Sequence, residues 1–182
     1  MLVDELIYSL RLDIGDTNKT EFSDYQIINT LNSVLKIVNN ALTKRKSDLI
    51  TKNAVLALEN DETELPADFI AIVRVVNENM YELFPQKPLN DFGYKIVGNS
   101  LTAQTPVVTI TYRYSFPKIN LGGEIPLPDW FSELLKKYVI MLISQKVNQF
   151  DVSFSQMIEN DINNITSGRE YSVIERELPF FI

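Results

Sequence analysis

The residues that could do chemistry in this chain are carboxylates, because its 182 residues include neither His nor Cys. Without His, the chain lacks the commonest general base near neutral pH and the commonest metal ligand. Without Cys, disulfides, thiolate nucleophiles and zinc–thiolate sites are excluded as well. Three close carboxylate pairs remain: Asp13 with Asp16, Asp61 with Glu62, and Glu159 with Asp161. Each pair is expected in a turn or on a polar helix face, which favours solvated side chains.

The densest acidic stretch, Glu59-Asn-Asp-Glu-Thr-Glu64, is predicted to be a turn. It could attract Ca²⁺, but it lacks the loop glycine and the bidentate acid at the spacing that calcium loops use. The chain also has no Gly-rich phosphate loop and no Gly-x-Ser-x-Gly elbow. A carboxylate-only glycosidase pair stays open, because its members can be distant in the chain. We predict that the protein is not an enzyme, has no catalytic or metal-binding residue, and carries no cofactor.

Two tyrosines flank an arginine at Tyr112-Arg113-Tyr114, a pattern that resembles a base-stacking platform. The net charge of -7 and the sequence pI near 4.7 argue against tight nucleic-acid binding, which relies on a basic face. Core or interface packing is therefore the favoured interpretation of these rings.

Apolar residues at helical spacing occur at both ends of the chain. They predict helices over about residues 2–12 and 23–46, and again from about 128 and from about 154. The second helix has the clearest start, since Ser23 and Gln26 can form a capping box. Its last residues, Lys44, Arg45 and Lys46, are interpreted as a solvated end that suits the helix dipole. Gly15 is available for a positive φ after the first helix, and Gly168 for the residue after the last.

The middle of the chain favours strands, because its apolar runs are short and rich in β-branched residues. Gly98-Asn99 predicts a two-residue hairpin turn with a positive φ at Gly98. The expected strands are Ala54–Leu58, Phe69–Val76, Tyr81–Phe84, Tyr94–Val97, Ser100–Ala103 and Val107–Tyr114. The predicted fold class is α+β: a helical bundle of N-terminal and C-terminal helices with an inserted small antiparallel β-sheet and an extended C-terminal tail.

The C-terminal tail, Arg169 to Ile182, is too short to form its own core, and its composition is unusually apolar for a solvated segment. Two interpretations stay open: the tail folds back on its own domain, or it docks on another molecule. The predicted docking residues are Arg169, Tyr171, Val173, Ile174, Leu178, Pro179, Phe180, Phe181 and Ile182.

The N-terminal sequence Met1-Leu-Val-Asp-Glu lacks the basic region of a signal peptide. No apolar run approaches the roughly 18 residues that a membrane span needs. We therefore expect a soluble intracellular protein that does not enter a membrane.

Four local motifs, in this order, resemble the head-to-tail connector (adaptor, or head completion) proteins of tailed bacteriophages. They are Leu12-Asp-Ile-Gly-Asp16; Phe22-Ser-Asp-Tyr-Gln-Ile-Ile-Asn-Thr-Leu-Asn32; Glu64-Leu-Pro-Ala-Asp-Phe-Ile70; and Leu127-Pro-Asp-Trp130, which follows a Tyr-x-Tyr strand. Each motif is mostly a helix cap or a turn, so the combination carries the resemblance.

The resemblance implies a structural virion protein of the phage neck, assembled in the host cytoplasm. Such proteins form a ring, commonly of twelve copies, which joins the capsid portal protein to the tail or other neck proteins. DNA passes through the ring during genome ejection without specific binding. Residues 1–182 would form one connector domain, made of helical residues 1–48, a β insertion at 51–116, helical residues 127–167 and a docking tail at 169–182. The smallest members are purely helical, so the sheet is a departure from them.

Three other functions stay open from the sequence. The chain could be another neck or tail component, such as a tail-tubular or tail-completion protein. It could also be a small phage-encoded protein that binds and inhibits a host factor, or an enzyme with a carboxylate-only site. Oligomeric state separates the first two, because a neck protein assembles into a large ring and an inhibitor stays monomeric or dimeric.

Overall fold

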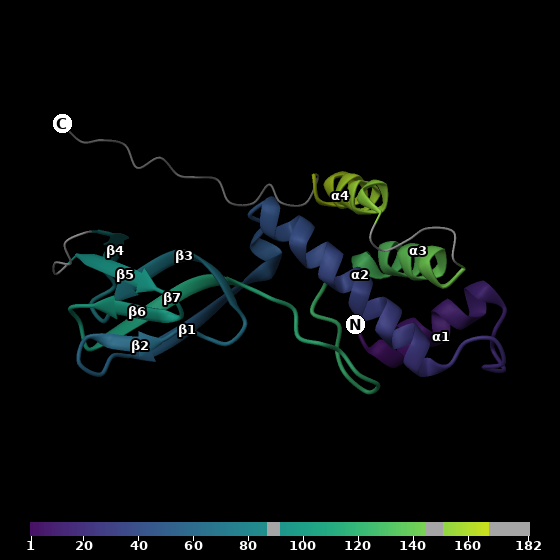
Figure 1. Ribbon diagram of the computed structural model, residues 1–182, viewed down its shortest axis with the longest axis horizontal. Helices are drawn as coiled ribbons and strands as arrows, with labels where there is room; N and C mark the ends of the chain where they lie inside the picture. The colour runs from purple at the N-terminus through teal and green to yellow at the C-terminus, as the bar shows by residue number, and fades with distance from the viewer. Residues whose placement is uncertain (87–91, 145–150, 168–182) are drawn as a thin grey trace. The chain divides into compact units, whose positions relative to one another are not determined.

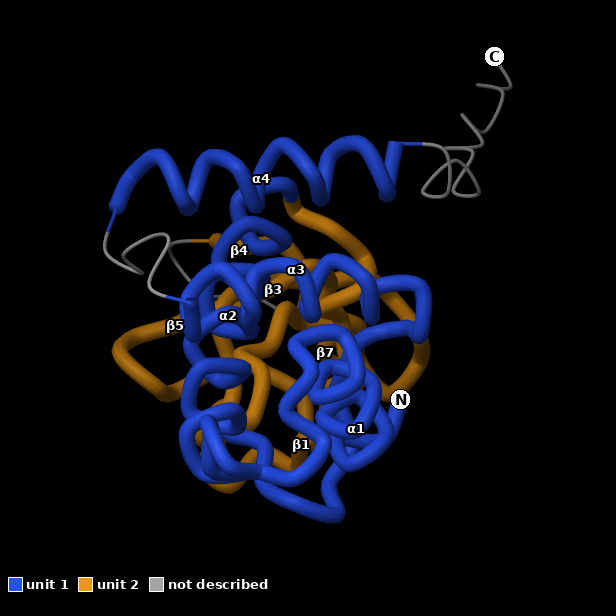
Figure 2. The backbone as a smooth tube through the Cα atoms, turned by 90° about the vertical axis from the view of Figure 1, so that its right-hand side faces the viewer, with its two compact units in different colours: residues 1–45, 118–182 blue, residues 46–117 orange. Residues whose placement is uncertain are grey.

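The computed structural model describes residues 1–86, 92–144 and 151–167. The fold is α+β, and the chain divides into two compact units, which Figure 2 shows in different colours. The helical unit comprises residues 1–45 and 118–182, and the β unit comprises residues 46–117. The β unit is therefore inserted between two parts of the helical unit along the sequence.

The helical unit contains an N-terminal pair and a C-terminal pair of α-helices (Figure 1). They are α1 (Val3–Ile14), α2 (Asp24–Lys44), α3 (Ser132–Ile143) and α4 (Val152–Thr166), with the short 3-10 helix η2 (Asp129–Phe131) before α3. Helix α2 packs against both α3 and α4, and α1 packs against α3. Among the described residues, no helix combines the length and the apolar character that a membrane crossing requires.

The ends of these helices follow from local capping chemistry. The Ser23 side chain accepts a hydrogen bond from the Gln26 N–H, and the Gln26 side chain accepts one from the Ser23 N–H, so the predicted capping box is confirmed. Gly15 ends α1 with φ 76°, as predicted for a left-handed position. Asp151 caps α4 through the Ser153 N–H. Gly168 lies outside the described residues.

The core of the helical unit consists of the apolar stripes that the sequence spacing predicted. The largest fully buried side chains come from all four of its α-helices and from η2. They are Leu10, Ile27, Leu31, Leu35, Leu42, Phe131, Leu135, Tyr138 and Phe154. Tyr138 and Phe154 meet edge to face at 5.4 Å between ring centroids, which joins α3 to α4.

The β unit begins with the short 3-10 helix η1 (Asp48–Ile50) and continues as a seven-stranded, nearly closed, barrel-like sheet. Its strands are β1 (Thr51–Ala57), β2 (Glu62–Glu64), β3 (Phe69–Asn77), β4 (Glu82–Pro85), β5 (Gly93–Val97), β6 (Ser100–Ala103) and β7 (Val107–Tyr114). The strand order is β1-β7-β3-β4-β5-β6-β2. The first and last strands in this order are therefore β1 and β2.

Two details of the sheet differ from the sequence prediction. The sheet is mixed rather than antiparallel, because β4 and β5 pair in parallel through Phe84 with Gly93 and Pro85 with Tyr94. The acidic stretch at 59–64 is only partly a turn, since its last three residues form β2 against β6. The predicted hairpin at Gly98-Asn99 is confirmed: Val97 pairs with Ser100, and Gly98 has φ 62°.

Candidate assembly surfaces

The predicted docking residues lie outside the part of the chain that the structure describes, because the description ends at Ser167. These residues are Arg169, Tyr171, Val173, Ile174, Leu178, Pro179, Phe180, Phe181 and Ile182. The candidate contact surfaces therefore lie on residues up to Ser167. The residues of the sequence motifs position the elements that carry these surfaces.

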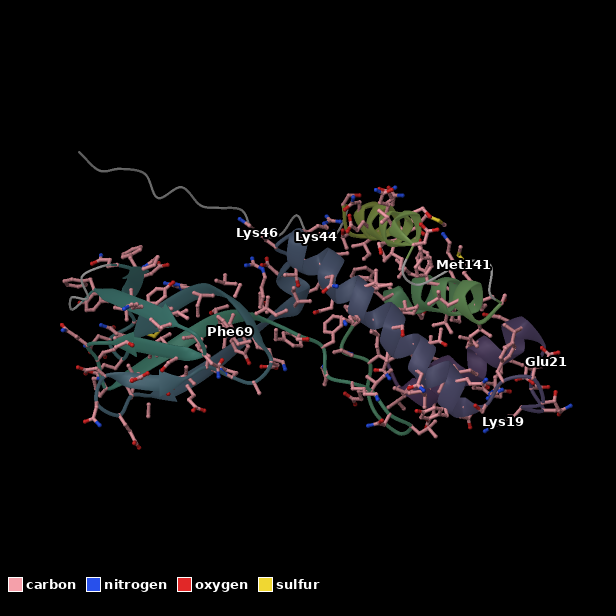
Figure 3. The ribbon with its side chains drawn as sticks, in the orientation of Figure 1. Lys19, Glu21, Lys44, Lys46, Phe69 and Met141 are labelled. Carbon is pink, nitrogen blue, oxygen red and sulfur yellow. The ribbon has the colours of Figure 1, made fainter. Side chains whose placement is uncertain are left out.

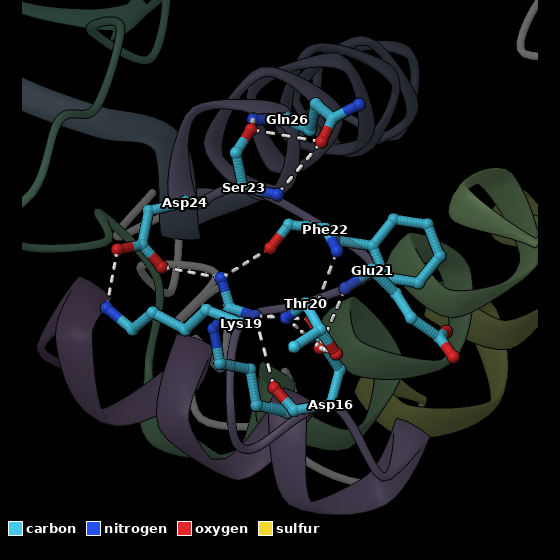
Figure 4. Close-up of polar contacts among 9 residues, drawn as sticks. Asp16, Lys19, Thr20, Glu21, Phe22, Ser23, Asp24 and Gln26 are labelled. Carbon is cyan, nitrogen blue, oxygen red and sulfur yellow. Dashed lines mark hydrogen bonds and ion pairs between the residues drawn. The ribbon is translucent and has the colours of Figure 1, made fainter.

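The loop between α1 and α2 is built around the carboxylate of Asp16 (Figure 4). Its Oδ1 accepts the backbone N–H groups of Thr20 at 2.7 Å and Glu21 at 3.0 Å, and its Oδ2 accepts that of Phe22 at 3.1 Å. The backbone N–H of Glu21 is the largest influence that lowers the pKa of Asp16, and burial opposes it. Asp16 thus fixes the path of the chain from α1 into α2.

Arg11 joins this carboxylate to the start of α2. Its Nη1 donates to Asp16 Oδ2 at 2.6 Å, and its Nη2 donates to Asp24 Oδ1 at 2.6 Å and to the Phe22 carbonyl at 2.9 Å. The Arg11 side chain is 4% exposed and that of Asp16 is fully buried. Lys19 donates to the other oxygen of Asp24 at 2.7 Å. The hydrogen bonds from Lys19 and then Arg11 lower the pKa of Asp24.

This buried cluster corrects the prediction that all the carboxylate pairs are solvated. Asp16 is buried with Arg11, whereas Asp13 lies outside the cluster and pairs with Lys136 at 2.9 Å. Asp161 accepts bonds from Lys137 at 2.5 Å and from the Tyr138 hydroxyl at 2.7 Å, so it too has a structural partner. The members of these two pairs therefore have separate partners.

Two further motif residues, Asn32 and Asp68, form hydrogen bonds to residues that are distant in the sequence. Asn32 is clamped to Ile119 by a reciprocal pair of bonds: its amide nitrogen donates to the Ile119 carbonyl at 3.0 Å, and its oxygen accepts the Ile119 N–H at 2.9 Å. In the β unit, Asp68 accepts the Tyr112 hydroxyl at 2.9 Å and Lys52 Nζ at 2.8 Å. Residues of three of the four motifs that carry the resemblance therefore have structural roles in this chain.

The basic end of α2 is not simply solvated, as the sequence suggested. Lys44, labelled in Figure 3, forms an ion pair with Glu159. Arg45 Nη1 donates to the side-chain oxygen of Asn163 at 2.6 Å. Both partners lie on α4. The two cations therefore attach α4 to the end of α2, in addition to any favourable interaction with the helix dipole.

The aromatic pair on β7 is packed in the core, as predicted. Tyr112 is 4% exposed and Tyr114 is 7% exposed. Burial and the hydrogen bond to Asp68 raise the pKa of Tyr112 to about 12. Lys52 Nζ lies 3.9 Å from the centroid of the Tyr114 ring, a cation–π contact. Neither ring is available to stack on a nucleic-acid base.

The helical unit presents one exposed apolar surface beside the Arg11 cluster. A cavity of about 400 Å³ is lined by Asp4, Ile7, Tyr8, Arg11, Lys19, Asp24 and Leu121. Tyr8 is 67% exposed and Leu121 is 56% exposed, and Leu12, one helical turn after Tyr8, is 53% exposed. We call Tyr8, Leu12 and Leu121 the junction surface.

The β unit presents a second exposed apolar surface, around β4. Met80, Tyr81, Phe84 and Phe92 are between 53% and 70% exposed. Met80 and Tyr81 lie in the turn that joins β3 to β4, and the Phe84 N–H donates to the Phe92 carbonyl at 2.9 Å. We call these four residues the tip surface. Aromatic residues and Met are enriched in protein–protein interfaces, so the composition favours a protein partner.

Neither a scan against protein-family models nor a search of the curated proteins found a match for this chain. Over the described residues, no group of three or more acidic side chains is placed to hold a metal ion. The assignment of function therefore depends on the motifs and on the two surfaces.

Sequence reasoning missed both surfaces and the role of Arg11. Arg11 immediately follows Leu10 on the buried side of α1, but its partners are five and thirteen residues further along the chain. The sequence signal for its burial was its position four residues after Ile7, on the apolar stripe of the helix. For the tip surface, the signal was the dense run Met80-Tyr-Glu-Leu-Phe84 in a segment expected to be a short strand.

Proposed function

We propose that this protein is a structural component of the phage neck, which assembles into a ring between the capsid portal protein and the tail and lets DNA pass through. The observation that carries the proposal is the exposure of large apolar side chains on both units, at the junction surface and at the tip surface. Exposed patches of this kind mark interaction sites in soluble proteins. The four sequence motifs of the connector family support the same function.

The difference between the two surfaces favours a ring over a simple dimer. A two-fold dimer uses one self-complementary surface, whereas a ring uses two unlike surfaces that contact each other in successive copies. The junction surface contains Tyr8, Leu12 and Leu121 around a cavity, and the tip surface contains projecting aromatic side chains. Two unlike surfaces can serve a neighbouring copy, the portal protein or another neck protein.

The tail at 169–182 is proposed to dock on the portal protein or on a neighbouring subunit. Seven of its residues are large and apolar: Tyr171, Val173, Ile174, Leu178, Phe180, Phe181 and Ile182. The net charge of -7 supports a passive conduit, because an acidic wall does not retain a polyanion that has to slide.

The first test is the size of the purified protein alone and mixed with the portal protein of the same phage, by light scattering and negative-stain microscopy. We expect a ring in at least one of the two samples. Removal of residues 169–182 should abolish portal docking and leave the helical content unchanged. A protein that stays monomeric or dimeric in both samples would contradict the proposal and favour a host-factor inhibitor.

Point variants test which surface is used. Tyr8→Glu at the junction surface and Phe84→Glu at the tip surface each place a charge in an exposed apolar patch, so each is expected to reduce the ring or portal-bound fraction by about tenfold, as for the loss of one good interface contact. Val152→Glu is the matched control, because Val152 is also exposed, at 70%, but belongs to neither surface. Equal effects of all three variants would contradict the assignment of the surfaces.

A further inference from the structure

The nearly closed sheet of the β unit is open at one place, between β1 and β2. The chain turns from one strand into the other through Asn60 and Asp61, which both have positive φ. Glu59 and Glu62 flank this turn and exchange two backbone hydrogen bonds, of 2.9 and 3.1 Å. Beyond that single pair the strands part, since β1 pairs with β7 and β2 pairs with β6. We call the opening between them the seam.

The ladder pattern shows which backbone groups face the seam. The Leu58 N–H donates to the Pro106 carbonyl, and the groups of an antiparallel strand alternate between its two sides. Ala57 and Val55 therefore direct their backbone groups away from β7 and into the seam. At β2, the Leu65 N–H donates to the Asn99 carbonyl, and the Asp61 carbonyl accepts the Ala103 N–H. By the same alternation, the backbone groups of Glu64 point away from β6 and face the seam.

These seam-facing groups are unpaired with each other. If the hairpin continued regularly from Glu59 and Glu62, Ala57 would pair with Glu64. Between the described strands β1 and β2, the structure has no such backbone hydrogen bond. Unpaired strand edges are templates for another strand, and Val55, which is 71% exposed on β1, is the kind of side chain that such a strand would cover.

The seam also has space and a definite charge. A cavity of about 650 Å³ is lined by Ala57, Glu59, Asn60, Glu62, Thr63, Glu64, Asn99 and Ser100. Glu62 accepts a hydrogen bond from the Ser100 hydroxyl. Among the ion pairs of the described residues, none involves the three glutamates of this cavity. An extended segment with a cation on one face would complement this lining.

We propose that the seam receives part of residues 168–182 of a second copy as an added β-strand, an inference that rests on the proposed assembly function. The stretch Tyr171-Ser-Val-Ile-Glu-Arg176 has no Pro or Gly and contains three residues that favour strands. On an added strand Glu175 and Arg176 would lie on opposite faces, so one face would supply a cation for the glutamates. The fifteen residues after Ser167 can span up to roughly 50 Å when extended, enough to reach a neighbouring molecule. Main-chain bonds would give affinity, as in other strand-addition complexes.

Disulfide trapping tests this proposal cleanly, because the chain has no native Cys. Full-length protein with Ala57→Cys is mixed with full-length protein carrying Val173→Cys or, separately, Ile174→Cys, and the mixture is oxidised. We expect a disulfide-linked pair of copies with at least one of the two tail positions. A chain that carries both substitutions but links only within itself would show that the tail binds its own seam, and no link at all would show that the seam is not its site. Either result overturns the proposal.

A backbone variant separates strand addition from simple proximity. Val55→Pro in the Ala57→Cys protein removes an N–H that faces the seam and makes no bond to β7, a position where an edge strand tolerates proline. We expect the cross-linking rate to fall by at least about tenfold, the equivalent of a lost backbone bond and a blocked edge. Val55→Thr keeps the N–H and should leave the rate unchanged. Equal rates for the two variants would overturn the strand-addition model.

The failure of this inference can be distinguished from the failure of the proposed function. Light scattering on the same samples reports assembly whether or not the disulfide forms. A ring without trapping would remove the seam as the tail's receptor and leave the neck function standing. Absence of both a ring and portal binding would contradict the proposed function itself.

Discussion

The helical unit and the β unit use charged residues in opposite ways. In the helical unit, Arg11 and Asp16 are almost completely buried, and with Asp24 they tie the loop after α1 to the start of α2. In the β unit, the corresponding pair is Lys52 with Asp68, whose side chains are 45% and 31% exposed. Buried pairs leave an uncompensated charge when one partner is removed, whereas exposed pairs contribute little.

This difference shows which contacts stabilise each unit. The helical unit depends on one internal ion cluster as well as on its apolar core, so a single polar substitution there should be severe. The β unit depends on strand pairing and on buried residues such as Leu101 and Ile110, and its ion pair is peripheral. It can therefore expose a seam and an apolar tip without losing its fold.

The largest expected effect is that of Arg11→Ala. It leaves Asp16 and part of Asp24 without their buried cation, so we expect the free energy of unfolding to fall by about 3–5 kcal/mol. Lys52→Ala in the β unit is the matched comparison, with an expected loss of about 0–1 kcal/mol. Urea titration measured by the fluorescence of the single Trp, Trp130 of the helical unit, checks the first value, and hydrogen exchange at β7 checks the second. Similar losses in the two variants would refute the comparison.

Acid should weaken the helical unit through the same cluster. The pKa of Asp16 is lowered from 3.8, mainly by the Glu21 N–H, and that of Asp24 is lowered by Lys19 and Arg11. A carboxyl whose folded pKa lies below its unfolded value contributes stability that is complete above the unfolded pKa and is lost as pH falls through the folded one.

The resulting pH dependence can be measured with the Trp130 signal. Stability of the helical unit should be nearly constant between about pH 7 and about pH 5 and should fall below about pH 4. Asp68 also has a lowered pKa: burial, the largest single influence, raises the pKa, but the hydrogen bonds from Lys52 and Tyr112 outweigh burial. The β unit should therefore lose some stability in the same pH range. The partial exposure of Asp68 predicts a smaller loss. An acid transition in which strand amides lose protection before helix amides would reverse this order.

A much smaller effect than that of Arg11→Ala is expected for Ser23→Ala. It removes the side-chain half of the capping box at the start of α2, which is worth about 1 kcal/mol. Gly98→Val in the β5–β6 turn is the counterpart in the other unit, because a β-branched residue at φ 62° costs about 1–2 kcal/mol. Thermal unfolding of both variants checks these values. An unchanged melting temperature for Ser23→Ala would show that the cap is redundant with the nearby Arg11 cluster.

The parts of the fold that were predictable from the sequence are those encoded locally. The capping box at Ser23, the left-handed Gly15 and the Gly98 turn depend on neighbours within a few residues, and all three are confirmed. Strand β2 was missed because Glu-Thr-Glu has no strand preference of its own, and its pairing with β6 determines it. The parallel pairing of β4 and β5 was missed for the same reason, since only the tertiary arrangement specifies it.

The candidate surfaces were less accessible to sequence reasoning than the fold. The exposure of Phe84 is a consequence of strand register, because a slip of one residue would turn its side chain to the other face. Arg11 was missed because a buried arginine has no local signature, and its partners are found only once the loop has folded around Asp16. The predicted docking tail stays a prediction, as its residues lie beyond the described part.

The two ends of the β unit meet where Thr51 pairs with Arg113, and Arg113 Nη2 also donates to the Lys46 carbonyl at 3.1 Å. A segment whose first and last residues lie close together can be inserted or removed as a whole, because the rest of the protein only has to bridge a short distance. A single insertion or deletion at this position could therefore add or remove the whole sheet. Engineers could use the same position to graft a foreign module between residues 46 and 118.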